Sequence, residues 1–328
     1  MGVVGGRTAW GVLSTAGINR KVLAGAAKSD RVDVVAVASR ELATAEAYAA
    51  EHGIERAYGS YEALLEAPEV EAVYISLPNS LHVEWSIRAL EAGKHVLCEK
   101  PLDRSPDEVA RAFDAAEAAD RFLMEAFMYR HNPQTRRLKE LVDQGAVGEL
   151  RLVRAQFSFT LTELGNVRMR PELKGGSLMD VGCYCVSGTR LLAGEPETVV
   201  ARELPSTTGV DVRFAGAMTF PGGVLAHFDC GFDTGDRSEL EAAGPEGSLI
   251  VRSPWHCHDP GIELWLDGRL SERIPVEAAD SYQLELENLS DAIRGEASPL
   301  LGRTDALGQA RAIDALYRAA ASGERIEL

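Results

Sequence analysis

The stretch HVLCEKPLD, residues 95–103, shows how the first half of this chain is built. It begins as an apolar run suited to a buried strand, and Glu99, Lys100 and Pro101 then follow in direct succession. Proline stops strand pairing and biases the residue before it toward an extended conformation. We therefore expect a strand that ends here and holds the Lys100 side chain at its carboxyl end.

Short apolar runs and Ala- and Glu-rich stretches alternate through the first 125 residues. We expect strands in WGVLSTA, RVDVVAVAS, VEAVYISLP, HVLCE and RFLMEA, and helices in stretches such as ELATAEAYAAEHG, which Gly53 ends. Apolar strands that alternate with helices form a parallel sheet covered on both faces, and ligands bind at the carboxyl ends of such strands. The sequence therefore predicts a doubly wound α/β domain over residues 1–127.

The second half of the chain has a different pattern. Five segments are typical of strands joined by Gly, Pro and Asp turns: GELRLVRAQFSFTL, TVVARELP, VDVRFAGAMTFPGGVLAHFDCGF, RSELEAAGPEGSLIV and GIELWLDGRL. One apolar helix is expected over 177–193, and two helices close the chain, SYQLELENLSDAIRG and DALGQARAIDALYRAAASG. Short turns favour antiparallel pairing. We therefore expect residues 128–328 to form an α+β domain around a large, mostly antiparallel open sheet, with the C-terminal helix free to pack back on the first domain.

The composition excludes several classes of partner. Asp and Glu number 50 against 34 Lys and Arg, which gives a net charge of −16 at pH 7. A surface this acidic repels phosphate backbones and anionic lipid, so we expect neither nucleic acid nor a membrane surface as a partner. No apolar run approaches the ~20 residues of a membrane span. The N-terminal MGVVGGRTAW lacks the basic start and apolar core of a signal peptide.

Cysteine and histidine usage indicates a cytoplasmic protein without a metal. The cysteines number five, and Cys183 and Cys185 are too closely spaced in a predicted helix to pair easily. This usage suits thiols in a reducing cytoplasm. The HCH sequence at 256–258 has no second ligand cluster, so an ordinary loop is expected there.

Two turns of the first domain carry residues suited to a dinucleotide. In GVLSTAGIN, Ser14, Ala16 and Asn19 occupy the glycine positions of the G-x-G-x-x-G pattern. A pyrophosphate could approach this turn, although an ordinary strand-to-helix turn fits equally well. After the second strand, Ser39-Arg40 replaces the acidic residue of NAD-binding folds. A hydroxyl and a guanidinium suit a 2′-phosphate, which favours NADP over the alternative of a solvated arginine.

Two further segments, LPNSLH (77–82) and CEKPL (98–102), are expected at strand carboxyl ends, and so at the rim of the same crevice. We expect Asn79 or Ser80 to cap the following helix. His82 is either part of this rim or a surface histidine. The sequence therefore predicts that both segments face the ligand.

These segments together resemble the Gfo/Idh/MocA family of pyridine-nucleotide oxidoreductases. The resemblance rests on CEKPL after LPNSLH, on SRELATAEAYAAEHGI, and on MEAFMYRHNPQ, GGSLMDVGCY and YQLELENLSDAIRG, and it extends over nearly the whole chain. The most similar branch contains NADP-linked aldose 1-dehydrogenases, dihydrodiol dehydrogenases and glucose-fructose oxidoreductase. In that family the Glu-Lys-Pro segment, often with a cis Lys-Pro bond, places its lysine beside the nicotinamide and the substrate.

The resemblance implies that the two domains have different functions. Residues 1–127 would be an NADP-binding Rossmann domain, and residues 128–328 would bind substrate and form oligomers. The cofactor-binding residues would be Ser14, Thr15, Ala16, Ile18, Ser39, Arg40, Leu77, Pro78, Asn79, His82, Glu99 and Lys100.

Asp180 and Tyr184 are the expected partners of Lys100. They are four residues apart, hence on one face of the predicted helix. Spacing alone favours a structural role, with Tyr184 in the core and Asp180 capping or solvated. The resemblance implies instead that Tyr184 is the acid/base, Lys100 its electrostatic partner, and Asp180 the holder of a substrate hydroxyl. Two residues depart from the family's phosphate loop: Asn19 replaces its small third residue, and Ser14 replaces a glycine common elsewhere in the family.

The sequence therefore predicts a cytoplasmic NADP-dependent oxidoreductase, a homo-oligomer (dimer or tetramer), that moves a hydride between nicotinamide and a carbinol or carbonyl carbon of a sugar-like polyol. Two alternatives remain open. One is a ketoreductase acting on a nucleotide-linked sugar, aided by Arg168 and Arg170. The other is a non-catalytic sugar- or nucleotide-sensing regulator on the same fold, against which the joint presence of Lys100, Asp180 and Tyr184 argues.

Overall fold

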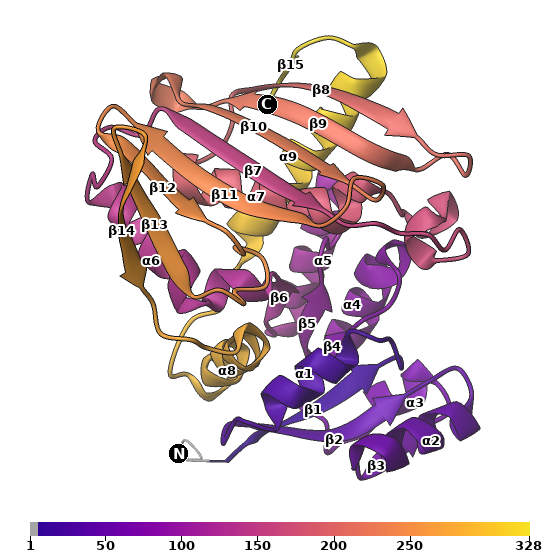
Figure 1. Cartoon of the computed structure of the whole chain (residues 1–328). Coiled ribbons are helices and arrows are strands. Elements are labelled where there is room, and N and C mark those ends of the chain that lie inside the picture. The colour runs from indigo at the N-terminus through magenta and orange to yellow at the C-terminus, as the bar shows by residue number, and fades with distance from the viewer. Residues whose placement is uncertain (1–5) are drawn as a thin grey trace. The chain divides into compact units, whose positions relative to one another are not determined.

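The computed structural model describes residues 6–328 (Figure 1), so residues 1–5 of the stretch inspected for a signal peptide lie outside the described part. The chain forms two compact units, and each has its own sheet. Unit 1 contains the chain up to Asp103, Asp107–Met128 and Asp280–Ala306, and unit 2 contains Arg104–Pro106, Tyr129–Ala279 and Leu307–Leu328. Each unit therefore combines segments that are far apart in the sequence.

Unit 1 has a six-stranded sheet in the order β3-β2-β1-β4-β5-β6, and its pairings are parallel. The strands are β1 (Thr8–Leu13), β2 (Val32–Ala38), β3 (Arg56–Tyr58), β4 (Ala72–Ile75), β5 (His95–Glu99) and β6 (Leu123–Ala126). The predicted α/β class is confirmed, and this order aligns the carboxyl ends of β2, β1, β4 and β5 along one edge. The sequence does not predict β3, because three residues make no recognisable run.

Local signals explain where several helices of unit 1 begin and end. The helices are α1 (Asn19–Ala26), α2 (Leu42–His52), α3 (Tyr61–Leu65), α4 (His82–Glu91), α5 (Pro106–Ala119) and α8 (Ser281–Arg294). Gly53, the predicted stop of α2, has φ 69°, a left-handed conformation that glycine adopts without strain. Asp280 caps α8 by accepting bonds from the amides of Tyr282 and Gln283.

The N-cap residue of α4 is Leu81 and not the predicted Asn79 or Ser80. A 3-10 turn, Asn79–Leu81, leads into α4, and the N-cap residue Leu81 makes no side-chain cap bond. The Leu81 amide donates to the Pro78 carbonyl at 2.8 Å. The His82 amide, the first of α4, donates to the Asn79 carbonyl, so backbone carbonyls of the turn satisfy amides at the start of the helix.

The helix α8 completes unit 1 although it comes from the far end of the chain. It packs closely on α1, because a Cβ at Gly25 would lie 2.6 Å from the Gln283 amide nitrogen. At the edge of this contact Lys28 pairs with Asp280 at 2.7 Å. Exposed pairs of this kind contribute little, so the buried apolar side of α8, with Leu286 and Leu289, supplies most of the stabilisation.

Unit 2 has a nine-stranded sheet in the order β14-β13-β12-β11-β7-β10-β9-β8-β15. The strands are β7 (Leu152–Ser158), β8 (Thr198–Pro205), β9 (Asp211–Thr219), β10 (Leu225–Gly231), β11 (Arg237–Gly244), β12 (Gly247–Val251), β13 (Gly261–Leu266), β14 (Arg269–Pro275) and β15 (Ile326–Glu327). Among these named strands only β7 and β10 pair in parallel. The predicted mostly antiparallel sheet is therefore confirmed.

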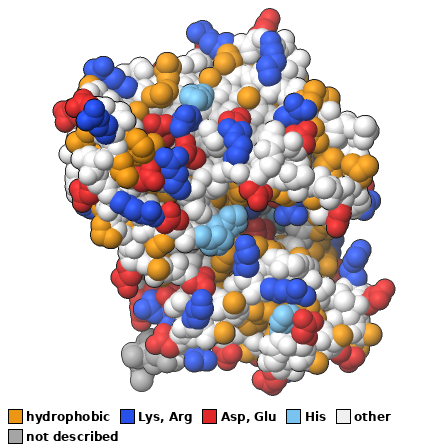
Figure 2. Space-filling model, in the orientation of Figure 1, with side chains coloured by type: hydrophobic (Ala, Val, Ile, Leu, Met, Phe, Trp, Pro, Cys, Tyr) orange, Lys and Arg blue, Asp and Glu red, His pale blue; other side chains and the backbone are white. Residues whose placement is uncertain are grey.

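Within residues 6–328, helices cover one face of this sheet and leave the other face open (Figure 1). The helix α6 (Pro133–Asp143) packs against β13, and α7 (Cys183–Ala193) packs against β7, β10 and β11. The helix α9 (Arg303–Ser322) reaches β9, where the rings of Tyr317 and Phe214 lie 5.6 Å apart. On the open face, Figure 2 shows hydrophobic side chains interspersed with Lys, Arg, Asp and Glu.

The predicted helix over 177–193 is not one regular helix. Leu178–Gly182 form a π-helical turn that continues into α7. Such turns insert an extra residue into a helix and occur frequently at functional sites. Gly182 lies in a tight contact here, since a Cβ would lie 2.6 Å from the Cys230 sulfur. Hydrophobic spacing does not reveal a single π turn, because one turn of either helix presents a similar apolar pattern.

The cysteines and the HCH loop take part in no metal cluster in the described residues. All five cysteines are buried thiols. His256 and His258 stack with ring centres 5.3 Å apart, and within residues 6–328 no group of three His, Cys, Asp or Glu side chains could hold a metal ion. In the same range, no helix combines the length and the apolar character that crossing a bilayer requires.

Candidate active site

The turn after β1 is held by hydrogen bonds where the family pattern has glycine. Ser14 has φ 106°, which residues with a side chain rarely adopt. Its hydroxyl lies 2.8 Å from the Ser76 hydroxyl and accepts a bond from the Ala16 amide at 3.2 Å. The Asn19 side chain donates to the Ser14 carbonyl at 2.9 Å. The two residues that depart from the expected loop pattern therefore stabilise this turn.

A cavity of about 270 Å³ opens beside the turn. It is lined by Thr15, Ala16, Gly17 and Arg20 on one side and by Thr44, Ala47, Tyr48 and Glu51 of α2 on the other. Arg20 lies 3.8 Å from Glu51, and both side chains are largely exposed. Arg20 is a second cation near the turn that the sequence does not reveal, because a strand-helix pattern does not show which side of α2 faces the loop.

Ser39 and Arg40 follow β2 at the same edge of the sheet. The Ser39 amide donates to the Tyr58 carbonyl at 3.0 Å, which fixes the end of β2 against β3. Arg40 is exposed, and no carboxylate in the described part of the chain pairs with it. A guanidinium without a carboxylate partner at this position suits an incoming phosphate.

His82 joins the two rim segments from inside the protein. Its side chain is fully buried, so the alternative of a surface histidine is wrong. Its Nδ1 lies 2.9 Å from the Pro101 carbonyl and its Nε2 lies 2.7 Å from the Leu77 carbonyl. Burial lowers the pKa of His82. The neutral ring donates to one of these carbonyls at a time, and it ties the end of the β4 segment to the Lys100-Pro101 segment.

The backbone around Lys100 is fixed on both sides. The strand β5 ends at Glu99, and the Lys100-Pro101 peptide is cis. The Glu99 carboxylate accepts the Tyr74 hydroxyl at 2.5 Å and the Lys100 amide at 3.3 Å. Beyond Pro101, the Leu102 amide donates to the buried carboxylate of Glu125 at 2.7 Å. The predicted strand end that presents Lys100 is therefore observed.

Unit 1 contains another carboxyl group near Glu99 that the sequence does not reveal. Glu285 on α8 is fully buried, and neither of its oxygens has a hydrogen-bond partner. Burial, followed by the charge of Glu99, raises the pKa of Glu285 well above its usual range. Its buried position therefore favours the uncharged form of the carboxyl group. It escapes detection because α8 also contains Glu287 and Asp291, and acidic residues on a helix usually lie on its solvated face.

In unit 2, Asp180 lies within the π-helical turn and is paired. The Arg168 guanidinium donates to its carboxylate at 2.6 Å, and the Asp180 side chain is 17% exposed. The π turn ends at Gly182, between Asp180 and Tyr184. The spacing between these two side chains is therefore not that of one regular α-helix.

Tyr184 lies in an aromatic cluster of unit 2. It is 7% exposed. Its ring centre lies 5.4 Å from that of Phe157, 5.8 Å from that of Tyr129 and 5.9 Å from that of Trp255. The Tyr129 hydroxyl donates to Ser187 at 2.7 Å. These rings hold Tyr184 in a defined orientation, as a proton-transfer residue requires.

Two family models match this chain. One, described as "Oxidoreductase family, NAD-binding Rossmann fold", matches residues 9–127, and a GFO/IDH/MocA C-terminal domain model matches residues 135–250. The chain belongs to the GFO/IDH/MocA oxidoreductase family. The predicted family is thereby confirmed, and the protein is an oxidoreductase.

Relatives of known activity are similar over the whole length. The chain is 40% identical over 324 residues to a D-xylose 1-dehydrogenase (NADP⁺) from Haloferax volcanii, covering 97% of this chain and 99% of the relative. An aldose-aldose oxidoreductase from Caulobacter crescentus has a TM-score of 0.92 at 27% identity, over 98% and 100% of the two chains. A 3-ketoreductase from Actinomadura kijaniata, in complex with NADP and TDP-benzene, has a TM-score of 0.89 at 31% identity, over 96% and 98%.

The GFO/IDH/MocA fold brings together part of the predicted site within unit 1. The twelve residues predicted to bind the cofactor lie at or after the carboxyl ends of β1, β2, β4 and β5, which are neighbouring parallel strands of one sheet. Asp180 and Tyr184 belong to unit 2. The roles of these residues remain predictions.

Proposed function

We propose that this protein is an NADP-dependent dehydrogenase or reductase that acts on a carbinol or carbonyl carbon of a sugar-like polyol. The choice of NADP rests on Arg40, which is exposed and follows β2. No carboxylate within residues 6–328 pairs with it. A 2′-phosphate on the adenosine ribose would accept charge-assisted hydrogen bonds from that guanidinium. The NADP-linked xylose dehydrogenase and the NADP-bound ketoreductase among its relatives support the same choice.

In this proposal the cofactor carries the hydride, and residues of the chain bind the cofactor, orient the substrate and transfer the proton. When bound, NADP supplies or accepts the hydride. Ser39 and Arg40 hold the 2′-phosphate. Tyr184 takes the proton from the substrate hydroxyl during oxidation and returns it during reduction, and Lys100 stabilises the charge on the tyrosine oxygen. Asp180 accepts a hydrogen bond from a neighbouring substrate hydroxyl and so orients the sugar. Solved structures of the related ketoreductase include one with a lysine replaced by alanine and one with a tyrosine replaced by phenylalanine.

A free sugar is the better-supported substrate class. A nucleotide-linked sugar would need cations for its diphosphate, for which Arg168 and Arg170 are the candidates. Arg168 pairs with Asp180 and Arg170 pairs with Glu172, each at 2.6 Å. A diphosphate would have to compete with both carboxylates, whereas neutral hydroxyls can share an arginine-carboxylate pair without disrupting it.

The experiment is a substrate screen of the purified protein with NADP⁺ and with NADPH. The panel contains aldoses including D-xylose, cyclitols, dihydrodiols, keto-sugars and a nucleotide-linked keto-sugar, and absorbance of the reduced cofactor is the readout. We expect turnover of at least one free polyol or sugar, with NADP(H) preferred over NAD(H), and its loss in Lys100→Met. Turnover of the nucleotide-linked sugar alone would favour the ketoreductase. Tight NADPH binding without any turnover would contradict the proposal and favour a regulator.

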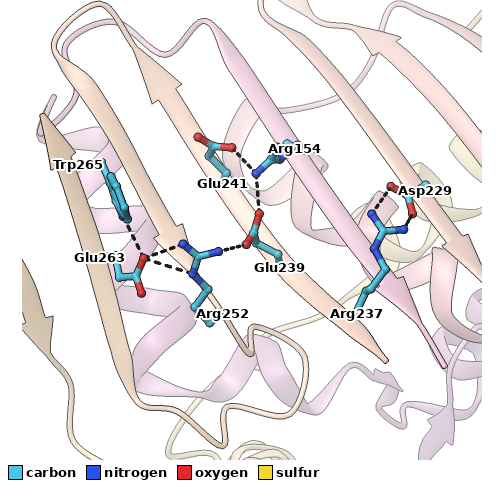
Figure 3. Close-up of polar contacts among 8 residues, drawn as sticks. All are labelled: Arg154, Asp229, Arg237, Glu239, Glu241, Arg252, Glu263 and Trp265. Carbon is cyan, nitrogen blue, oxygen red and sulfur yellow. Dashed lines mark hydrogen bonds and ion pairs between the residues drawn. The ribbon is translucent and has the colours of Figure 1, made fainter. Parts of the chain in front are cut away.

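The open face of the unit 2 sheet is the proposed surface for homo-oligomer formation. Figure 3 shows a row of ion pairs across it: Arg154 donates to Glu239 at 2.6 Å, and Arg252 pairs with both Glu239 and Glu263. Exposed apolar side chains lie beside this row, and Leu152 and Leu225 are directly opposite in register with exposed fractions of 37% and 52%. Internally paired charges next to exposed leucines suit a second copy of the same face.

Light scattering of the purified protein tests this surface. We expect a dimer or tetramer. Leu225→Glu should shift the mass toward the monomer, because it places a charge among the exposed leucines of this face. Leu300→Glu, at a leucine of similar exposure (43%) in unit 1, is the matched control and should leave the mass unchanged. A monomeric wild type would contradict the proposal. We further propose a cytoplasmic location, supported by the five buried thiols.

A further inference from the structure

Asp211, at the start of β9, is a buried carboxylate with a full set of partners. Its Oδ2 accepts bonds from the Ser177 hydroxyl and the Leu178 amide, each at 2.7 Å. Its Oδ1 accepts the Tyr317 hydroxyl at 3.0 Å. Burial raises the pKa of Asp211, and these donors act in the opposite direction. A carboxylate that is 5% exposed persists in this place because the donors replace the lost water.

The donors to Oδ2 stand at the start of the π-helical turn that carries Asp180. Gly176, just before them, packs against Asp211 so closely that a Cβ would lie 2.2 Å from Oδ1. The Gly176 carbonyl accepts the Asp180 amide at 3.0 Å, and the Gly176 amide donates to the Arg168 carbonyl at 2.9 Å. The Arg168 guanidinium then reaches the Asp180 carboxylate at 2.6 Å. Both the backbone and the side chain of Asp180 therefore depend on where Asp211 holds this segment.

Tyr317 on α9 links Asp211 to a third segment of unit 2. The Arg104 guanidinium lies 5.2 Å from the centre of the Tyr317 ring. Arg104 follows Lys100 by four positions in the sequence and belongs to the same unit as Tyr317. The pair of Tyr317 and Asp211 thus connects α9, β9 and the π-helical turn with the segment that follows Lys100.

We propose that Asp211, held by Tyr317, is a positioning residue for the reaction, and that it sets the direction of the Asp180 carboxylate through the start of the π-helical turn. The inference rests on the proposed function, in which Asp180 orients the sugar. Asp211 acts through Asp180 and touches no substrate. Misplacing an orienting group by ~1 Å can cost ~10²-fold in rate, so the effect is large enough to separate from a change in stability.

The experiment measures kcat and KM for the best sugar, the Kd of NADPH and the thermal midpoint in wild type and four variants. Asp211→Ala should lower kcat/KM for the sugar by ~10- to 100-fold, with the Kd of NADPH nearly unchanged because the proposed cofactor residues lie in unit 1. Asp211→Asn keeps an acceptor oxygen for Ser177 and Leu178 and should recover most of the activity. Tyr317→Phe removes one of the three donors and should lower kcat/KM by a smaller factor.

Phe214→Leu is the matched control, because Phe214 lies on the same strand, is 2% exposed and packs on Tyr317 without donating to Asp211. It should lower the thermal midpoint and leave kcat/KM unchanged. Asp211→Ala with a lowered midpoint and wild-type kcat and KM would overturn the inference. Should Asp211→Ala not fold, an unchanged kcat/KM in Tyr317→Phe would overturn it equally. If the wild-type protein turns over no sugar, the proposed function itself is wrong. This outcome is distinguishable, because it is seen before any variant is compared.

Discussion

Replacing Tyr184 by phenylalanine removes a hydroxyl and leaves the ring, so turnover should collapse while the fold persists. The ring contacts with Phe157 at 5.4 Å and Trp255 at 5.9 Å remain available to phenylalanine. Removing the hydroxyl should therefore lower the free energy of unfolding by at most about the worth of one hydrogen bond, ~0.5–1.5 kcal/mol. Positioned proton transfer is worth ~10²–10⁴ in rate, or roughly 3–5 kcal/mol of activation free energy. The kinetic effect should therefore exceed the structural one.

The assay is the turnover rate as a function of pH, with a substrate deuterated at the reacting carbon to show that the hydride step limits the rate. Tyr184→His should keep partial activity with its optimum at lower pH, because imidazole titrates near ~6.5 and a tyrosine hydroxyl near ~10. A Tyr184→Phe protein with undiminished turnover and a full isotope effect would refute the reasoning and remove Tyr184 from the mechanism.

Tyr129→Phe is the matched control for this experiment. Tyr129 belongs to the same aromatic cluster and is fully buried, and its hydroxyl donates to Ser187 at 2.7 Å. Arg130 also donates to the Ser187 hydroxyl, at 3.3 Å, so Ser187 keeps a partner in the variant. We expect a similar or larger loss of thermal stability than in Tyr184→Phe, with turnover within a fewfold of wild type.

Three further predictions concern unit 1. Arg40→Ala should weaken NADPH binding by roughly ten- to more than a hundredfold, because it loses a charge-assisted phosphate contact worth ~1.5–3 kcal/mol, and it should leave NADH binding unchanged. Fluorescence titration measures both affinities, and an NADPH affinity equal to that of the wild type would refute the assignment. Ser14→Ala should be less stable than Ser14→Gly by about 1–2 kcal/mol in urea unfolding, because both lose the hydroxyl bonds and only alanine keeps the strain of φ 106°; the reverse order would contradict this account of the turn. Glu285→Gln should gain stability relative to wild type as pH rises from ~4 toward 8. The raised pKa keeps the folded Glu285 protonated while the unfolded chain releases that proton above ~4.3, so wild-type stability falls with pH and that of the glutamine variant does not. A difference in thermal midpoint that is independent of pH would show that Glu285 is ionised in the folded protein.

The sequence by itself determined the features that depend on neighbouring residues. The alternation of apolar runs and helices predicts the parallel sheet of unit 1, because a strand buried on both faces needs a continuous apolar run. The end of β5 at Glu99 follows from Pro101, and the stop of α2 follows from Gly53. The prediction of a phosphate site at Ser39-Arg40 needs only local facts, namely its position after a strand and its charge.

Only the tertiary structure decided the features that depend on distant segments. The full burial of His82 and of Glu285, the bonds that hold Ser14 at φ 106°, and the π-helical turn around Asp180 leave no local signal. Glu285 illustrates the reason: an acidic residue on a helix usually lies on the solvated face, yet α8 packs on α1 from the far end of the chain and takes this carboxyl group out of water. Burial and pKa are set by what the rest of the fold places around a side chain, and the residues nearest to it in the sequence do not contain that information.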